Sequence, residues 1–295
     1  MCLRQESYQI FFHLYKMIQF ENCPVSVNNV PPEGDGFDIF ASNVSFSENL
    51  SIEYLSQLGV EGKTDVDGDS RPYPTAPPNG TVNIDFYISG SNDVGPFLAL
   101  KKYSYQQGEG DLIDLSIGPY SFSDVILTSY GVNATSNEVI TANMSLDFYG
   151  ELQQSSPPAQ DVTTGKLGHG SFSAGTFESL GFLTAPFSFS YSFDQSYEIL
   201  RGLGSNVLDE ALWREGSETI SAEGYDLPTG VAGTPRSDTS STWFFPKSGP
   251  MEFIIKDICG KPITGVGLTG FVTSRDVSIS EDNVLNGSIE VSKEL

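Results

Sequence analysis

The chain has 295 residues, of which 38% are hydrophobic and 18% charged, so it is long enough for one large β domain or two ordinary domains. Its 15 Lys and Arg residues against 38 Asp and Glu give a formal net charge of −23, which excludes a basic face that holds phosphates. Its 30 Gly and 17 Pro residues predict a folded, turn-rich protein instead of a low-complexity one.

The first sixteen residues contain the apolar stretch Ile10–Tyr15, interrupted by His13 and followed by no small-residue cleavage site. This pattern argues against a signal peptide, and we expect residues 1–16 to be a flexible N-terminal arm or a mis-called extension. No run approaches the roughly 18 apolar residues of a membrane helix, so no membrane insertion is expected. The three cysteines (Cys2, Cys23 and Cys259) have neither disulfide-framework nor zinc-site spacing and leave the redox compartment open.

From residue 17 onward the sequence predicts an all-β domain. Ser45–Tyr54 and Thr81–Ile88 alternate polar and apolar residues with the period of two that a half-buried strand requires. The long polar loop Glu61–Gly80 separates them, and Pro96–Tyr105 is a weak helix candidate. Gln153–Asp161 is polar and proline-bearing, as interdomain linkers are. We therefore expect a first β domain over residues 17–153 and a linker over residues 154–165.

The second half predicts a similar domain over residues 166–295. Phe187–Phe193 alternates as a strand does. Asn206–Glu215 offers an Asn cap with apolar residues on one face and predicts a short helix. Gly216–Thr242 is predicted to be a second long loop, and loops of that length are usually functional or disordered.

The two halves resemble each other in sequence. Ser45–Gly59 and Ser190–Gly204, 145 positions apart, share seven of fifteen residues. Shorter matches follow in the same order at offsets of 141 and 143, the latter aligning Asn143 with Asn286. Serine-rich strands can also match by composition alone. However, surface loops of unequal length would change the offset between matches in this way while the strands keep their register. The pattern predicts two tandem homologous β-sandwich or barrel domains with one or two short helices.

The sequence nominates no catalytic residue, cofactor or metal site. Its two histidines lie far from any matched strand, which disfavours a His-based triad or metal centre. Gly265–Gly270 satisfies a GxGxxG string, but strand-like residues follow it where a phosphate site needs a helix. Asp65, Asp67 and Asp69 alternate as in calcium loops, but Ser70 and Ala76 replace the Gly and Glu that such a loop uses. We therefore expect a non-enzymatic protein.

Leu127–Tyr149, together with Ala41–Ser47 and Ile52–Leu55, resembles strands of the tail tube proteins of long-tailed bacteriophages. The resemblance covers roughly residues 17–153 and 166–295. It implies a structural virion protein, assembled in the host cytoplasm, whose rings stack into a tail tube around a DNA channel. Rings of three two-domain chains would have pseudo-sixfold symmetry. The implied partners are copies of the chain, a tape-measure protein, tail-end proteins, and DNA that passes without specific binding.

A ring-forming protein needs contacts within and between rings. We expect Thr81–Ile88 to supply an edge strand between subunits, with Thr81, Asn83, Asp85 and Tyr87 as candidates. Candidates for contacts between rings lie in or beside the two long loops: Asp65, Asp67, Asp69, Arg71, Tyr73, Tyr225 and Arg236.

A channel wall richer in carboxylates than in Lys and Arg would repel DNA. The alternative function is that of another virion neck or decoration protein, or a cell-surface adhesin, that binds a partner or glycan.

Overall fold

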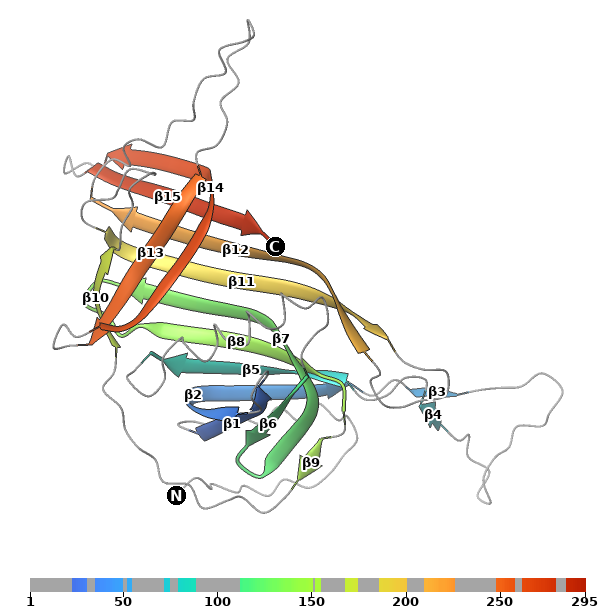
Figure 1. Cartoon of the computed structure of the whole chain (residues 1–295). Helices are drawn as coiled ribbons and strands as arrows, with labels where there is room; N and C mark the ends of the chain where they lie inside the picture. The colour runs from blue at the N-terminus through green and yellow to red at the C-terminus, as the bar shows by residue number, and fades with distance from the viewer. Residues whose placement is uncertain are drawn as a thin grey trace, which may run out of the picture.

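The structure is a computed structural model that describes thirteen segments of the chain: residues 23–30, 35–49, 52–54, 72–74, 79–88, 112–150, 152–154, 168–174, 186–200, 210–225, 248–257, 262–279 and 285–295. All regular elements in these segments are β-strands (Figure 1). Their bounds are β1 Cys23–Val30, β2 Asp35–Asn49, β3 Ile52–Tyr54, β4 Pro72–Pro74, β5 Asn79–Tyr87, β6 Ile113–Ile117, β7 Tyr120–Thr135, β8 Thr141–Phe148, β9 Gln153–Gln154, β10 Gly168–Ala174, β11 Pro186–Leu200, β12 Glu210–Gly224, β13 Ser248–Asp257, β14 Pro262–Ile279 and β15 Leu285–Glu294.

Six strands of the first half form a closed barrel. The order around the barrel is β6-β1-β2-β5-β8-β7, and β7 closes it by pairing with both β8 and β6. A two-residue hairpin joins β6 to β7, and its first residue, Gly118, has a φ of 54°, which favours glycine there. The predicted all-β class and barrel architecture are confirmed.

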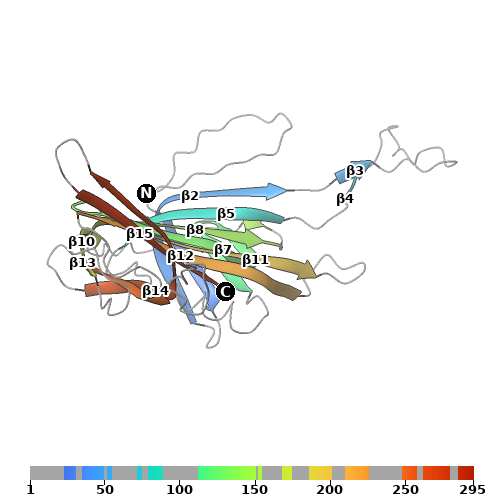
Figure 2. The ribbon, with the colours of Figure 1, turned by 90° about the horizontal axis from the view of Figure 1, so that it is seen from above.

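The strands of the second half extend the same sheet in the order β11-β12-β15-β14-β13-β10. β13 and β14 run diagonally across β11, β12 and β15 (Figures 1 and 2). The rings of Phe189 in β11 and Phe253 in β13 stack at 4.4 Å, so β13 packs on the face of β11. The short pair β3·β4 lies away from the large sheet (Figure 2).

The pairings in the two halves follow the same scheme. In the first half β2 pairs with β5, β5 with β8, β8 with β7, β7 with β6 and β6 with β1. In the second half β11 pairs with β12, β12 with β15, β15 with β14, β14 with β13 and β13 with β10. The sixth barrel pairing, β1·β2, has no counterpart among the described residues, because its equivalent would involve residues that precede Pro186.

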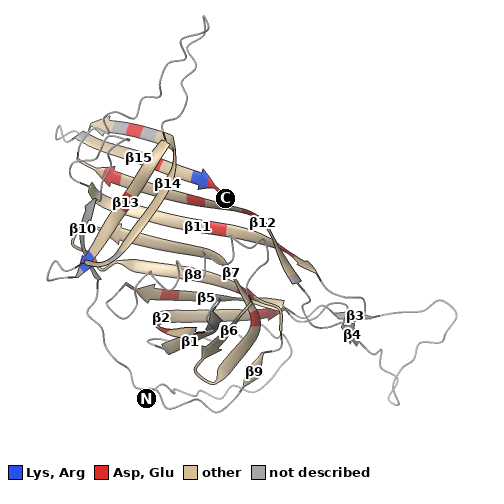
Figure 3. Ribbon diagram, viewed as in Figure 1, with Lys and Arg blue, Asp and Glu red and all other residues tan. Residues whose placement is uncertain are grey.

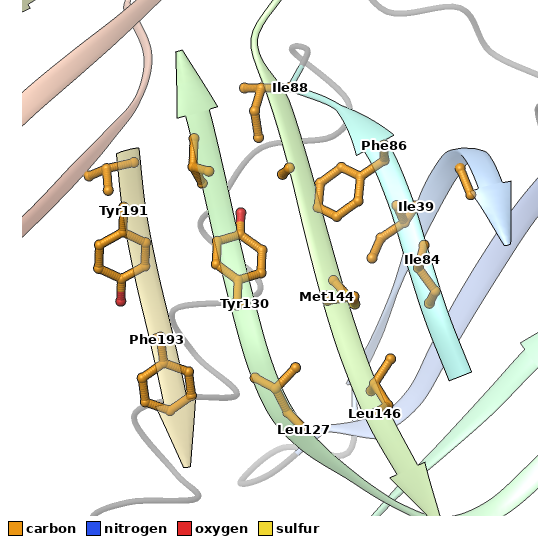
Figure 4. Close-up of a cluster of buried hydrophobic side chains, with 14 of the residues drawn as sticks. Ile39, Ile84, Phe86, Ile88, Leu127, Tyr130, Met144, Leu146, Tyr191 and Phe193 are labelled. Atoms are coloured by element: carbon orange, nitrogen blue, oxygen red, sulfur yellow. The ribbon is translucent and has the colours of Figure 1, made fainter. Parts of the chain in front are cut away.

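One hydrophobic core serves both halves. It includes Ile84 and Phe86 of β5, Leu127 and Tyr130 of β7, and reaches Phe193 of β11. Figure 4 shows these side chains in a continuous row across β5, β8, β7 and β11. Large aromatic and branched side chains on facing strands bury apolar area at about 25 cal/mol per Å², so this row holds the two groups of strands together.

Two local expectations from the sequence were wrong. The helix expected over residues 206–215 is replaced from residue 210 onward by β12, because its backbone forms a long antiparallel ladder with β11, from Pro186↔Gly224 to Leu200↔Glu210. Residues 216–224, which were expected to open a long loop, also belong to β12, and residues 226–242 of the expected loop lie outside the described residues. The other helix candidate, residues 96–105, lies outside the described residues, as does the linker apart from Gln154 in β9.

Candidate assembly interface

The predicted edge strand occupies an interior position of the barrel. Thr81, Asn83, Asp85 and Tyr87 belong to β5, which pairs with β2 along one edge and with β8 along the other. The Asp85 carboxylate accepts a hydrogen bond from the Asn43 amide at 3.0 Å. Because both edges of β5 are paired within the chain, these residues offer no free edge to a neighbouring subunit, and the edge-strand prediction requires correction.

The candidates for contacts between rings are only partly described. Tyr73 lies in β4, within the pair that stands apart from the main sheet. Tyr225 follows β12, is 59% exposed and packs its ring 4.7 Å from that of Phe187. The remaining five, Asp65, Asp67, Asp69, Arg71 and Arg236, lie outside the described residues. Their role stays a prediction.

The two groups of strands meet where β11 pairs with β7. Seven residue pairs, from Ser188↔Thr135 to Asp194↔Ser129, form this antiparallel ladder. On its buried face Tyr191 lies opposite Val132 and Phe193 opposite Tyr130. Burial raises the pKa of Tyr191, which keeps its hydroxyl neutral. The Gln195 amide, also buried, donates a hydrogen bond to the Leu127 carbonyl and closes one end of the junction.

This junction joins non-equivalent edges. β11 pairs with the last part of the β7 edge whose first part pairs with β6. The opposite edge of β7 pairs with β8. β11 offers one edge to β7 and the other to β12. When two units join through two different edges, each unit keeps the edge of the other type free for a further partner. This is the geometry of head-to-tail assembly.

The strand edges that are unpaired in the described part of the chain include one on β2 and one on β14. β2 pairs with β1 up to Ala41 and with β5 on its opposite edge from Ala41 to Asn49, so the β1-side edge beyond Ala41 carries no strand described here. β14 pairs with β13 up to Phe271 and with β15 on its opposite edge from Phe271 to Ile279. Its β13-side edge beyond Phe271 is likewise unpaired. Open edges of this kind are templates for pairing with another chain.

Acidic side chains surround the junction. A shallow, open depression beside it is lined in part by Asp194, Glu215 and Glu294. Arg214 forms an exposed ion pair with Glu198 in the adjoining ladder. Figure 3 shows acidic residues distributed over both groups of strands. The Lys and Arg residues whose side chains are described are Arg214, Lys256 and Lys293, so the described surface is predominantly anionic.

Two partly buried carboxyl groups in the barrel have raised pKa values. Burial, followed by the charge of Asp114, raises the pKa of Asp124, which has a φ of 55°. Burial raises the pKa of Asp147 and outweighs a 2.8 Å hydrogen bond donated by the Thr81 hydroxyl. The described residues contain no group of His, Cys, Asp and Glu able to hold a metal ion.

No protein-family model and no curated protein matches the chain. Among the described segments no helix is long and apolar enough to cross a membrane. The strand edges, the junction and the charge distribution therefore carry the functional argument.

Proposed function

We propose that the chain is a non-enzymatic structural subunit of the phage tail-tube type, which assembles with copies of itself into rings that stack around a DNA-conducting channel. The observation that carries this proposal is the β7·β11 junction. It joins two strand groups with the same pairing scheme through unlike edges, and it leaves one edge of each type open at β2 and β14. Repetition of a head-to-tail contact generates a closed ring or a filament.

We infer that the two halves are a tandem duplication, in support of which two irregularities recur. Ser42 of β2 and Phe187 of β11 are both skipped in the ladders to β5 and β12. Thr128 of β7 and Thr273 of β14 are both skipped in the ladders to β8 and β15. β-bulges are specific features that related strands keep. Each bulge pair is 145 residues apart, the offset of the longest sequence match.

The hydroxyl groups of the two bulged threonines also reach equivalent residues. The Thr128 hydroxyl donates a hydrogen bond to the Ser145 carbonyl at 3.0 Å. The Thr273 hydroxyl lies 3.5 Å from the Glu290 carbonyl and makes its shorter hydrogen bond, at 2.7 Å, to the Glu290 carboxylate. Ser145 and Glu290 are again 145 residues apart. This single offset supports alignment of β7 with β14 and of β8 with β15 in place of the offsets of 141 and 143 suggested by the sequence.

The charge of the chain supports passage of DNA in preference to its retention. Binding to a duplex gains most of its affinity from cations that displace counterions from the phosphates. With a net charge of −23, rings of this chain would repel the DNA backbone. We infer that the channel wall carries more carboxylates than Lys and Arg, and that tape-measure and tail-end proteins complete the assembly.

Electron microscopy of the purified full-length chain tests the proposal. At high protein concentration and high salt we expect rings or short tubes with an open lumen. A protein that stays monomeric under these conditions and binds a glycan or partner saturably would contradict the tube function, and would favour the alternative of a neck, decoration or adhesin module.

A further inference from the structure

Equivalent strands identify which open edges are complementary. The offset of 145 residues relates β2 to β11 and β7 to β14. The edge of β11 that pairs with β7 is therefore equivalent to the open edge of β2. The edge of β7 that pairs with β11 is equivalent to the open edge of β14. The chain thus contains one completed junction and the two separated halves of another.

We propose that the open edge of β14 pairs with the open edge of β2 in a second copy of the chain, in the register of the β7·β11 junction. This inference rests on the proposed self-assembly and specifies its interface. Transfer of the seven β7·β11 pairs by 145 residues places Ser274–Ser280 antiparallel to Asn49–Asn43. Six of these pairs, from Asn49 with Ser274 to Val44 with Ile279, lie within the described residues. The central pairs are then Asp276 with Ser47, Val277 with Phe46 and Ser278 with Ser45.

Exposed apolar side chains support an absent neighbour at β14. Ile279 is 69% exposed, whereas Ala134, its equivalent in β7, is 2% exposed beside β11. Phe271, which pairs with both β13 and β15 and directly precedes the open edge, is 53% exposed, whereas its equivalent Ile126 is 1% exposed. Large apolar side chains left exposed on a strand with an open edge are typical of a surface that another chain covers. In the proposed register Ile279 lies opposite Val44.

The charges in the proposed register are complementary. In the internal junction Phe193 lies directly opposite Tyr130. The equivalents of these two residues at the offset of 145 are Glu48 and Arg275, which therefore lie opposite each other in the proposed register. Arg275 is one of only four Lys or Arg residues in the described segments. A directly opposed pair of unlike charges stabilises a strand ladder. Its occurrence in this register favours a second copy of the same acidic chain as the occupant of the edge.

Cysteine cross-linking tests the register. Directly opposed residues of an antiparallel pair lie about 4.5–5.5 Å apart between Cα atoms, which is within disulfide range. Mixing a Ser45→Cys chain with a Ser278→Cys chain, followed by mild oxidation, should give covalent dimers, and each variant alone should not. One chain with both substitutions should give a ladder of oligomers, with the 45–278 link identified by mass spectrometry of peptides. The parent chain, with its native cysteines, sets the baseline.

Two matched variants calibrate the cross-linking. Ser190→Cys with Asn133→Cys places cysteines at the equivalent pair of the internal junction, so it should form a disulfide within one chain and give no ladder. Ser278→Cys with Asn83→Cys moves one cysteine to the neighbouring strand, because Asn83 lies opposite Ser45 on β5. This pair should cross-link no more than the parent chain does.

The outcomes separate the interface from the function. Rings or tubes without the 45–278 link would overturn the proposed register and leave the tube function standing. A specific 45–278 link in particles without a lumen would support the interface and overturn the tube. Homodimers of the Ser45→Cys chain alone would indicate like-with-like pairing and overturn the proposal. A protein that neither assembles nor cross-links would overturn both proposals.

Discussion

Glu48 and Arg275 make the proposed contact sensitive to single charges. Reversal of one member, in Glu48→Arg or Arg275→Glu, should place like charges opposite each other and weaken assembly by about 1 kcal/mol per interface. The double variant Glu48→Arg/Arg275→Glu should recover most of this loss, because every copy supplies both edges. Sedimentation velocity across a concentration series measures the effect. Additive losses in the double variant would contradict the opposed pairing.

Asp147 should make the chain less stable at neutral than at mildly acidic pH. Its pKa is raised from 3.8 by burial, so the folded chain holds this proton more tightly than the unfolded chain does. The free energy of unfolding therefore falls as the pH rises from 3.8 through the folded pKa. Asp147→Asn removes the charge and keeps an acceptor for the Thr81 hydroxyl. We expect a higher thermal midpoint at pH 7 and a smaller decrease between acid and neutral pH.

Circular-dichroism melts of Asp147→Asn and the parent chain at several pH values between 4 and 7 measure this effect. Glu294→Gln, which changes an exposed side chain, is the matched control for loss of one negative charge. An equal gain in both variants would show that reduced overall repulsion, and not burial of Asp147, is responsible.

At the level of the strand, β14 and β7 should respond differently to the same change. Ile279→Asp alters an exposed residue, so the monomer should keep its stability within about 0.5 kcal/mol while assembly is lost. Ala134→Asp at the equivalent position of β7 buries a charge and should destabilise the monomer by about 3 kcal/mol. Urea denaturation and sedimentation distinguish the two effects. Unchanged assembly in Ile279→Asp would argue against a β14 interface.

Several strands could be predicted from the sequence, but their neighbours could not. The alternation in Thr81–Ile88 predicts a half-buried strand, and Val82, Ile84 and Phe86 are indeed buried in β5. Alternation describes the two faces of a strand and carries no information on whether its edges are paired, since that depends on residues far along the chain. For this reason the sequence predicted a free edge on β5, although both edges of β5 are paired and strands such as β2 and β14 have open edges.

The failed helix at residues 206–215 has a related cause. Its apolar residues have helical spacing, but a helix would lose the backbone hydrogen bonds that β12 makes with β11. Local helix propensity is a weak preference that such tertiary pairing overrides. The offset of 145 on which the proposed duplication rests also aligns Thr128 with Thr273 in the sequence, but the sequence match selected an offset of 141 in this region.

At the level of the whole molecule, assembly should depend strongly on salt. Each copy has a net charge of −23, and the repulsion between copies opposes every edge contact. The Debye length falls from about 10 Å at 0.1 M to about 3 Å at 1 M salt. We therefore expect the midpoint concentration for assembly, measured by light scattering, to fall as NaCl is raised over this range. Assembly that weakens with salt would indicate that attractive ion pairs dominate the interface.

β7 belongs to both groups of strands, because it closes the barrel by pairing with β8 and pairs with β11 on its other edge. This arrangement affects thermal denaturation. One hydrogen-bonded sheet and one hydrophobic core span both halves. Neither half is therefore expected to unfold independently of the other. Differential scanning calorimetry should record one endotherm whose van't Hoff and calorimetric enthalpies agree. Because β7 contributes to both halves, loss of either one would leave the other with a bare strand edge.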